Sequence, residues 1–237
     1  MTGKIPRANQ MHLPFDAEGP VYDDADGEAV GVASFILSLR ALGIRDIGLL
    51  RAMELVPREV FAPRRFTDLS RTDVSLPLPC GQTMTAPRTV AAMLLALGLQ
   101  SGHRILEIGT GSGYVTALLA RLGAEVVSVE RFNTLAESAV QHLKIVEVAN
   151  ARIETGDGLA VRPRERFDRV LLNGAWPNVP ASLLSLLGPG GRVVGAIETD
   201  GLPRLVRVDR LEDGEYRQEV GANLRLSSLL PGAATTL

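Results

Sequence analysis

The stretch RILEIGTGSGY, residues 104–114, decides the fold. RILEI is a short, mostly apolar run that predicts a buried strand. Gly109, Gly111 and Gly113 then permit a tight turn that lets a ligand approach the backbone closely. The next residues, YVTALLARLG, have helical spacing, and the first turn of that helix would present free N–H groups to the ligand. The stretch therefore predicts a strand, a nucleotide-binding turn and a helix.

Strand and helix patterns continue to alternate after this turn. Short apolar strands separated by helices are typical of a mostly parallel sheet that is covered on both faces. The sequence therefore predicts an α/β chain with a Rossmann-like, doubly wound, mostly parallel sheet and a late antiparallel hairpin. The expected strands are EVVSVE, ARIETGDG, FDRVLLNGAW and GGRVVGAI, the helices LAESAVQHLKIVEV and ASLLSLLG, and the hairpin LPRLVRVDRL with YRQEVGANLRL.

The part of the chain before the turn has a different pattern. Residues 1–30 contain three prolines and an acidic stretch, which indicate a flexible or extended arm. Residues 31–100 form an N-terminal helical extension with a loop on the substrate side, and residues 101–237 form the cofactor-binding domain. Helices are expected from near Ala33, from Asp46 to Leu55, and from near Pro87 to Gly98. Thr85 is placed to cap the last of these helices.

Composition and charge exclude several classes of function. The net charge of −2 argues against nucleic-acid binding, which needs a basic field. The single cysteine, Cys80, and the three scattered histidines favour neither a metal site nor a Ser-His-Asp triad. No apolar run reaches membrane-spanning length, and the first residues lack a charged-then-apolar leader pattern. These features predict a cytoplasmic protein with no membrane or nucleic-acid partner.

The acidic residues near the glycine turn indicate which cofactor it binds. Glu130 ends the next strand, 21 residues after Gly109, where a carboxylate can bond ribose hydroxyls. That geometry would serve NAD as well as S-adenosylmethionine. The dinucleotide-binding pattern, however, has glycine or alanine at the position of Tyr114. The acidic Glu107 beside the turn also disfavours a negatively charged pyrophosphate. Both residues suit a cationic cofactor without phosphate, which favours S-adenosylmethionine.

Two further candidates follow later strands at the same edge of the sheet. Asp157 and Gly158 end one strand segment, where ligands collect in open α/β sheets. They would also be explained as a simple Asp-Gly turn. Asn173 follows FDRVLL and is explained equally well as an amide that caps a loop.

These residues, together with VPREVF and GQTMTAP upstream of the turn, resemble the protein-L-isoaspartate O-methyltransferase family of S-adenosylmethionine-dependent enzymes, which repair isoaspartyl damage in proteins. The likeness runs from about Ser34 to Leu226. It implies S-adenosylmethionine as methyl donor, S-adenosylhomocysteine as product, and isoaspartyl peptides or proteins as substrate. The implied cofactor-binding residues are Glu107, Gly109, Thr110, Gly111, Gly113, Glu130, Arg131, Asp157, Gly158 and Asn173. The implied substrate-side residues are Gln82, Thr83, Met84 and Arg88, with Thr85 as the catalytic residue.

The acceptor side departs from the family pattern. Thr85 stands where relatives have serine, and Arg88 stands where many have histidine. Thr85 would orient the acceptor or only cap its helix, and Arg88 would pair with a substrate carboxylate or only be solvated. A related O-methyltransferase for another peptide or small-molecule carboxylate therefore stays open, as does a non-catalytic module that binds S-adenosylmethionine. The sequence predicts no oligomeric state.

Overall fold

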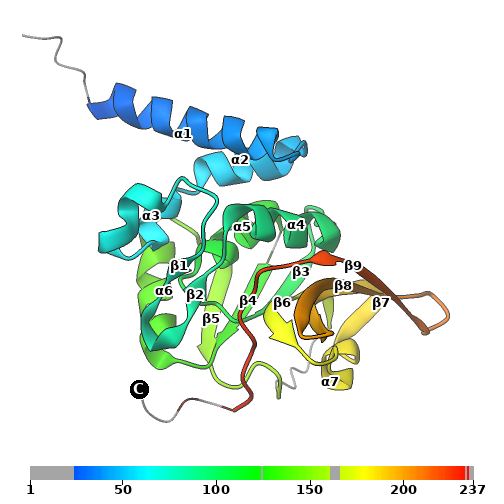
Figure 1. Ribbon diagram of the computed structural model, residues 1–237. Helices are drawn as coiled ribbons and strands as arrows, with labels where there is room; N and C mark the ends of the chain where they lie inside the picture. Colours follow the sequence, from blue (N-terminus) through cyan, green and yellow to red (C-terminus); the bar gives the residue numbers. More distant parts are fainter. Residues whose placement is uncertain (1–23, 124, 161–165, 233, 235–237) are drawn as a thin grey trace, which may run out of the picture.

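Seven strands form one sheet in the order β5-β4-β3-β6-β7-β8-β9. The computed structural model describes residues 24–123, 125–160, 166–232 and 234 (Figure 1). The strands from β3 to β7 are parallel, whereas β8 and β9 run antiparallel to their neighbours. The prediction of a mostly parallel, Rossmann-like sheet with a late hairpin is confirmed. The strands are β3 (Arg104–Ile108), β4 (Glu125–Glu130), β5 (Ala151–Thr155), β6 (Phe167–Trp176), β7 (Leu187–Thr199), β8 (Leu202–Arg210) and β9 (Tyr216–Asn223).

The two faces of the sheet are covered unequally. Helices α4 (Pro87–Leu97), α5 (Tyr114–Leu122) and α6 (Asn133–Ile145) pack on one face, where the larger hydrophobic core lies. The smaller core on the other face includes residues from α7 (Ala181–Leu184). The helix expected over ASLLSLLG is thus a single turn. Leu187 already belongs to β7, where it pairs with Phe167. The next four residues, GPGG, are glycines and a proline, which disfavour a helix.

The N-terminal extension adds a further layer of helices. Helices α1 (Asp24–Ala41) and α2 (Ile47–Leu55) lie above α4 and α5 in Figure 1, and α3 (Arg58–Phe61) follows them. Asp46 caps α2 as expected, because its carboxylate accepts a hydrogen bond from the N–H of Leu49 at 2.7 Å.

The expected arm over residues 1–30 differs from the structure where the two can be compared. Its first 23 residues lie outside the described part of the chain. Residues 24–30, however, are helical, so α1 begins at Asp24 rather than near Ala33. Acidic residues favour a helix N-terminus, which explains why the acidic stretch extends the helix despite Gly27 and Gly31.

The loop between α3 and α4 contains short elements that no periodicity predicted. These are a 3₁₀ turn η1 (Arg64–Leu69), the two-residue strand β1 (Leu76–Pro77), a second 3₁₀ turn η2 (Pro79–Gly81) and strand β2 (Thr83–Met84). Strands β1 and β2 pair antiparallel, with Leu76 opposite Met84. This small ribbon brings the GQTMTAP segment to the edge of the main sheet.

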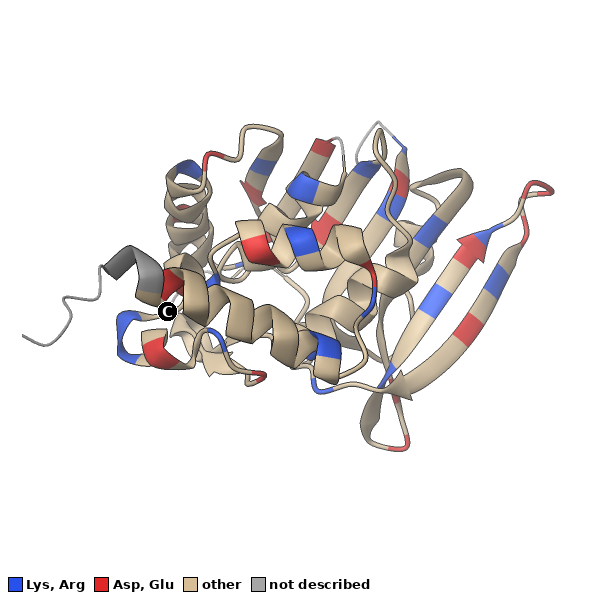
Figure 2. Cartoon of the chain, turned by 90° about the horizontal axis from the view of Figure 1, so that it is seen from above, with Lys and Arg blue, Asp and Glu red and all other residues tan. Residues whose placement is uncertain are grey.

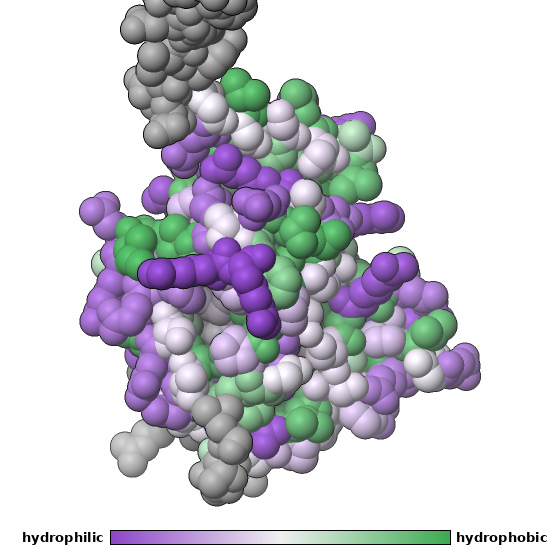
Figure 3. Space-filling view, turned by 60° about the vertical axis from the view of Figure 1, so that its left-hand side comes forward, coloured by the Kyte–Doolittle hydropathy of each residue, from purple (hydrophilic) through white to green (hydrophobic). Residues whose placement is uncertain are grey.

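Charges of both signs are interspersed on the surface. Figure 2 shows basic and acidic residues following one another along the β8–β9 hairpin, where Arg207, Asp209 and Glu219 form ion pairs. On the face that Figure 3 shows, small apolar patches are separated by hydrophilic side chains. Within the described residues, no helix combines the length and apolar character needed to cross a membrane.

Candidate functional site

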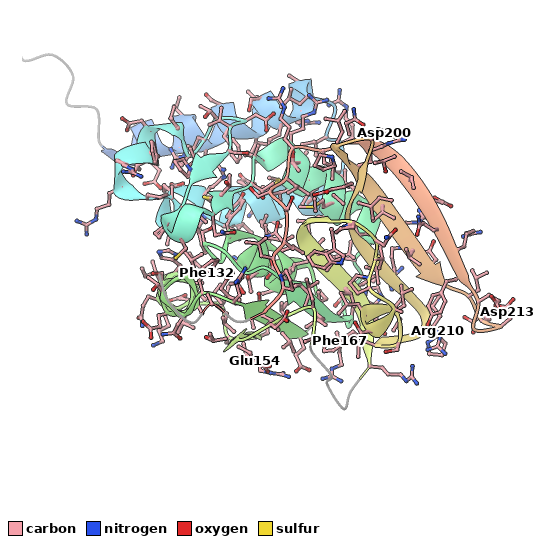
Figure 4. All side chains as sticks on the ribbon, turned by 60° about the horizontal axis from the view of Figure 1, so that its bottom comes forward. Phe132, Glu154, Phe167, Asp200, Arg210 and Asp213 are labelled. Atoms are coloured by element: carbon pink, nitrogen blue, oxygen red, sulfur yellow. The ribbon has the colours of Figure 1, made fainter. Side chains whose placement is uncertain are left out.

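A cavity of about 330 Å³ opens at the carboxyl edge of the parallel strands, where ligands bind in α/β folds. In Figure 4, Phe132 marks this edge, after β4, and Phe167 marks the opposite edge, at the start of β6. Several separate segments of the chain line the cavity. They supply Ser75, Gln82, Thr83 and Thr85; Ile108, Gly109, Gly111, Val129, Glu130 and Arg131; Asp157, Gly158, Leu159 and Asn173; and residues 225–230.

The glycine turn forms the floor of the cavity. Gly109, Gly111 and Gly113 have φ values of 92°, 56° and 87°, in the left-handed region that favours glycine. Gly109 and Gly111 line the cavity itself. Gly113 instead faces α6, because a Cβ there would lie 3.0 Å from the Cβ of Ala139. The third glycine therefore serves the packing of the turn rather than contact with a ligand.

Glu130 joins the glycine turn to the start of α6. One carboxylate oxygen accepts a hydrogen bond from the N–H of Gly111 at 2.9 Å, and the other accepts one from the N–H of Phe132 at 3.0 Å. The residue is only 4% exposed, yet it lines the cavity. Each carboxylate oxygen can accept a further hydrogen bond. The side chain can therefore hold the turn in shape and still accept bonds from a ribose.

Glu107 lies behind the turn rather than in the cavity. The same carboxyl oxygen accepts hydrogen bonds from the hydroxyls of Thr116 and Ser128, each at 2.6 Å. The residue is fully buried, and burial raises its pKa to about 7. Thr110 also lies outside the cavity lining, with its hydroxyl 2.5 Å from that of Ser128. The side chains of Glu107 and Thr110 therefore do not line the cavity. Both belong to a buried polar cluster that supports the turn from behind.

Asp157 and Gly158 form a turn and also line the cavity, so the structure agrees with both interpretations of the sequence, a simple Asp-Gly turn and a ligand-binding position. They form a turn, since the carboxylate of Asp157 accepts the N–H of Leu159 at 3.0 Å and that of Gly232 at 2.8 Å. They also line the cavity. A Cβ at Gly158 would lie 2.5 Å from Cγ2 of Ile108, so only glycine fits there without a shift. The backbone at Gly158 thus leaves a flat surface beside β3.

Asn173 fastens the glycine turn to strand β6. Its side-chain amide donates a hydrogen bond to the carbonyl oxygen of Gly109 at 3.0 Å. Its Oδ1 is buried and has no hydrogen-bond partner among the described residues. Asn173 lines the cavity with its other atoms, since Oδ1 itself is buried beneath the cavity surface. Arg131 lines the same wall, one residue after Glu130.

The GQTMTAP segment forms the opposite wall, but only part of it faces the cavity. Gln82, Thr83 and Thr85 line the cavity, whereas Met84 is 3% exposed and packs in the core. Successive side chains of an extended strand point to opposite sides, so Met84 must point away when Thr83 and Thr85 point inward. The Met84 side chain therefore lies outside the cavity lining, and this geometry does not support its predicted substrate-side role.

Thr85 does not cap the helix that follows it. The N-terminal cap of α4 is Ala86, without a side-chain hydrogen bond. The carboxylate of Asp73 accepts the N–H of Arg88 instead, at 2.8 Å. The Arg88 side chain is exposed and does not line the cavity, so the structure does not place it against a substrate carboxylate.

The segment 225–230, which we call the closing segment, was missed by the sequence patterns. It lies alongside the end of β6, where the N–H of Ala175 donates to the carbonyl of Ser227 at 2.9 Å and the N–H of Leu229 donates to the carbonyl of Ala175 at 2.8 Å. Leu229 packs against Gly174, where a Cβ would lie 2.6 Å from its Cγ. Only the lack of a side chain at Gly174 makes this approach possible.

Arg225, at the start of the closing segment, supplies the positive charge that was expected from Arg88. Its exposed side chain lines the cavity together with Thr85 and Gln82. It forms no ion pair with any residue that the structure describes. Within the same described part of the chain, no cluster of side chains is suited to hold a metal ion. The site is therefore a glycine turn with carboxylates on one side, and with hydroxyls and an unpaired guanidinium on the other.

Comparisons with known proteins match one enzyme family over most of the chain. A model of the protein-L-isoaspartate(D-aspartate) O-methyltransferase family matches residues 32–229. A protein-L-isoaspartate O-methyltransferase of Xanthobacter autotrophicus is 43% identical, over 90% of this chain and 98% of its own. Protein-L-isoaspartate O-methyltransferase 2 of Rhodopseudomonas palustris is 46% identical, over 86% of this chain and 94% of its own.

Solved structures show the same fold at lower identity. One is a protein-L-isoaspartate O-methyltransferase of Plasmodium falciparum, described as putative and bound to S-adenosyl-L-homocysteine. It has a TM-score of 0.73 and 21% identity, and the match covers 83% of this chain and 97% of that one. Another protein-L-isoaspartate O-methyltransferase has a TM-score of 0.74 and 24% identity, over 85% and 67% of the two chains.

Proposed function

Because the chain belongs to the protein-L-isoaspartate(D-aspartate) O-methyltransferase family, we propose that it transfers a methyl group from S-adenosylmethionine to the free carboxylate of isoaspartyl residues in damaged proteins. The chain is thus an S-adenosylmethionine-dependent methyltransferase, and S-adenosylhomocysteine is its product. We place the reaction in the cytoplasm as part of the same proposal. The observation that carries it is the cavity itself, which has a cofactor wall and a hydroxyl-bearing acceptor wall.

The residues of the cofactor wall fit a nucleoside with a cationic sulfur. Glu130 would hold the ribose, since its buried carboxylate keeps spare acceptor capacity. The flat surface at Gly158 would accept the adenine ring, and the amide of Asn173 holds the carbonyl of Gly109 in place beside the cofactor space. Among the described residues, the glycine turn itself is bordered by the carboxylate of Glu130 rather than by a basic side chain suited to a pyrophosphate. S-adenosylmethionine, when bound, supplies a methyl group on a positively charged sulfur that leaves as a neutral thioether.

The acceptor needs alignment more than activation. A carboxylate with an ordinary pKa of about 4 is already anionic at neutral pH, so no general base is required. Thr85 is 9% exposed and lines the cavity, and its hydroxyl makes no hydrogen bond to any described residue. The hydroxyl would donate to the acceptor carboxylate and orient it. Holding the reacting oxygen in line and excluding water is the main work of such a site.

Arg225 would supply the positive charge on the acceptor side. Arg225 lines the cavity together with Thr85 and Gln82, and it has no ion-pair partner among the described residues. An isoaspartyl residue carries a free carboxylate that an ordinary aspartyl residue in mid-chain presents at a different position. A guanidinium attracts the anion and also offers several donors in a fixed plane. We therefore assign to Arg225 the capture of the acceptor, and to Thr85 its final orientation.

The test compares two peptides of one sequence that differ only in an isoaspartyl or an aspartyl residue. We expect methyl transfer to the isoaspartyl peptide alone, read as methanol released from the labile ester. Equal transfer to both peptides would contradict isoaspartyl recognition. If neither peptide is methylated while S-adenosylhomocysteine still binds in a calorimeter, the acceptor is a different carboxylate. If S-adenosylhomocysteine does not bind either, the chain is not a methyltransferase.

A further inference from the structure

Arg58 is a buried arginine that ties three separate parts of the acceptor wall together. The residue is only 2% exposed. Its guanidinium donates hydrogen bonds to the backbone carbonyls of Ser70 at 2.7 Å, of Val74 at 3.1 Å and of Thr85 at 3.1 Å. Ser70 and Val74 bracket the short loop that contains Asp73, which caps α4. One side chain thus fixes both the backbone of Thr85 and the loop that starts the next helix.

The other face of the same guanidinium contacts the cofactor side. The guanidinium lies over the ring of Tyr114, 5.7 Å from its centroid. Tyr114 is the first residue of α5 and directly follows Gly113 of the glycine turn. The ring is held in turn by Phe61, with the two ring centroids 5.6 Å apart. Arg58 therefore lies between the acceptor residue Thr85 and the turn that receives the methyl donor.

This buried cation is not explained by an ion pair. Within the described part of the chain, no carboxylate lies within salt-bridge distance of Arg58. Burial lowers the pKa of the guanidinium, although Tyr114 and Asp73 act in the opposite direction. An apolar side chain of similar volume would fill the space without this desolvation cost. What such a side chain could not do is hold three carbonyls at fixed positions.

We propose that Arg58 is a positioning residue that sets the distance between Thr85 and the Gly109–Gly113 turn. It touches neither acceptor nor cofactor, and acts through the Thr85 carbonyl on one side and the Tyr114 ring on the other. The rigid planar fork of arginine suits this task, because its donors keep a fixed geometry that a lysine ammonium lacks. The inference rests on the proposed function for the reaction that the alignment serves, but the contacts themselves do not depend on it.

The test uses Arg58→Lys, Arg58→Met and a matched control, Arg169→Met. Arg169 also clamps backbone carbonyls, those of Leu97 at 2.9 Å and Asp168 at 2.8 Å, but it lies outside the cavity lining. For each protein we would measure the melting temperature, the dissociation constant of S-adenosylhomocysteine, and kcat and KM for the isoaspartyl peptide. Rates are expressed per mole of protein that binds S-adenosylhomocysteine, so that unfolded protein does not count.

We expect Arg58→Lys to lower kcat about 10- to 100-fold, since small misplacements at a reacting centre carry losses of that order. Its dissociation constant for S-adenosylhomocysteine should stay within about threefold of the wild type, because the cofactor contacts of Glu130 and Gly158 are untouched. Arg58→Met should lower kcat at least as much if it folds. Arg169→Met should lose stability without losing kcat.

An unchanged kcat in Arg58→Lys, or the same loss of kcat in Arg169→Met, would overturn the proposal. A readout without turnover separates this result from a failure of the proposed function. Amide hydrogen exchange over residues 70–85 should rise in Arg58→Lys but not in Arg169→Met, whatever the acceptor of the wild-type enzyme. If exchange in that segment does not rise, Arg58 does not position it.

Discussion

The carboxylate of Asp73 accepts a hydrogen bond from the N–H of Arg88, so the first turn of α4 is capped from a distant loop. The capping task that a polar residue before a helix usually performs is therefore already done by another side chain. This leaves the Thr85 hydroxyl free to face the cavity. The separation of the two tasks makes the role of Thr85 open to a direct experiment.

Thr85→Val should lower kcat for the isoaspartyl peptide by about 10- to 100-fold, because a hydrogen bond to a charged acceptor contributes about 1.5–3 kcal/mol. Thr85→Ser should keep most of the activity because the hydroxyl stays. Both variants should melt close to the wild type, since the hydroxyl caps no helix. Thr89→Val, an equal change on α4 outside the cavity lining, is the control. Full activity of Thr85→Val would show that the hydroxyl has no part in the reaction.

Glu130→Gln should weaken binding of the cofactor and its product. The glutamine amide has only one oxygen to accept the two backbone N–H groups of Gly111 and Phe132, so one N–H faces an NH₂ group. A hydrogen bond to a charged carboxylate contributes about 1.5–3 kcal/mol, so loss of the bond between Glu130 and the ribose should raise the dissociation constant of S-adenosylhomocysteine about 10- to 150-fold. Calorimetry measures this rise. Glu137→Gln, on the exposed face of α6, should leave the constant unchanged, and an equal effect of both changes would contradict the prediction.

Arg225→Gln should raise the KM for the isoaspartyl peptide by about tenfold, because a charge-assisted hydrogen bond to the acceptor is lost. Binding of S-adenosylhomocysteine should not change. The exposed position also predicts that salt raises KM more strongly in the wild type than in the variant. Steady-state kinetics at low and high salt provide the measurement, with Arg121→Gln on α5 as control. If Arg225→Gln lowers the affinity for the cofactor instead of the affinity for the peptide, Arg225 acts on the cofactor side of the cavity and the prediction fails.

Glu107 predicts a pH dependence of stability. Its folded-state pKa of about 7 lies above the ordinary value of 4.5, so the folded protein holds this proton more tightly than the unfolded chain does. The contribution of Glu107 to stability is therefore fully present below about pH 4.5 and is lost as the pH rises toward 7, by up to about 3 kcal/mol.

Urea unfolding of the wild type and of Glu107→Gln at pH 5 and pH 8 measures this effect. The glutamine cannot ionise, so the difference in unfolding free energy between wild type and variant should shift in favour of the variant at pH 8. Glu137→Gln, which removes an exposed carboxylate on α6, is the control. A constant difference between Glu107→Gln and the wild type at the two pH values would contradict a raised pKa at Glu107.

The sheet and the glycine turn could be predicted because their signals are local. The alternation of apolar strands and helices, and three glycines between RILEI and YVTALLARL, depend only on neighbouring residues. The prediction of Glu130, Asp157 and Gly158 at one edge also followed from the rule that parallel strands end together. The comparisons with known proteins confirm the family and the methyl donor, whereas the individual site residues stay predictions.

The acceptor wall could not be predicted in full, because its geometry depends on contacts between distant residues. Strand β2 has two residues, too few to reveal the alternation that turns Met84 inward. Arg88 is the cation that the sequence indicates on the acceptor side, and no sequence pattern points to Arg225. Arg225 reaches the cavity because Ser227 and Leu229, in the same segment, pair with Ala175. The role of Asp73 as the cap of α4 likewise has no local signal.

The closing segment has a consequence for the order in which the protein matures. Residues 225–230 follow every strand of the sheet along the chain, yet they form one wall of the cavity. During synthesis the strands from β3 to β9 are all made before this wall exists. A chain that has been made only as far as β9 therefore has every strand of the sheet but lacks this wall of the cavity. Cofactor binding thus distinguishes a chain that contains residues 225–230 from one whose synthesis stopped after β9.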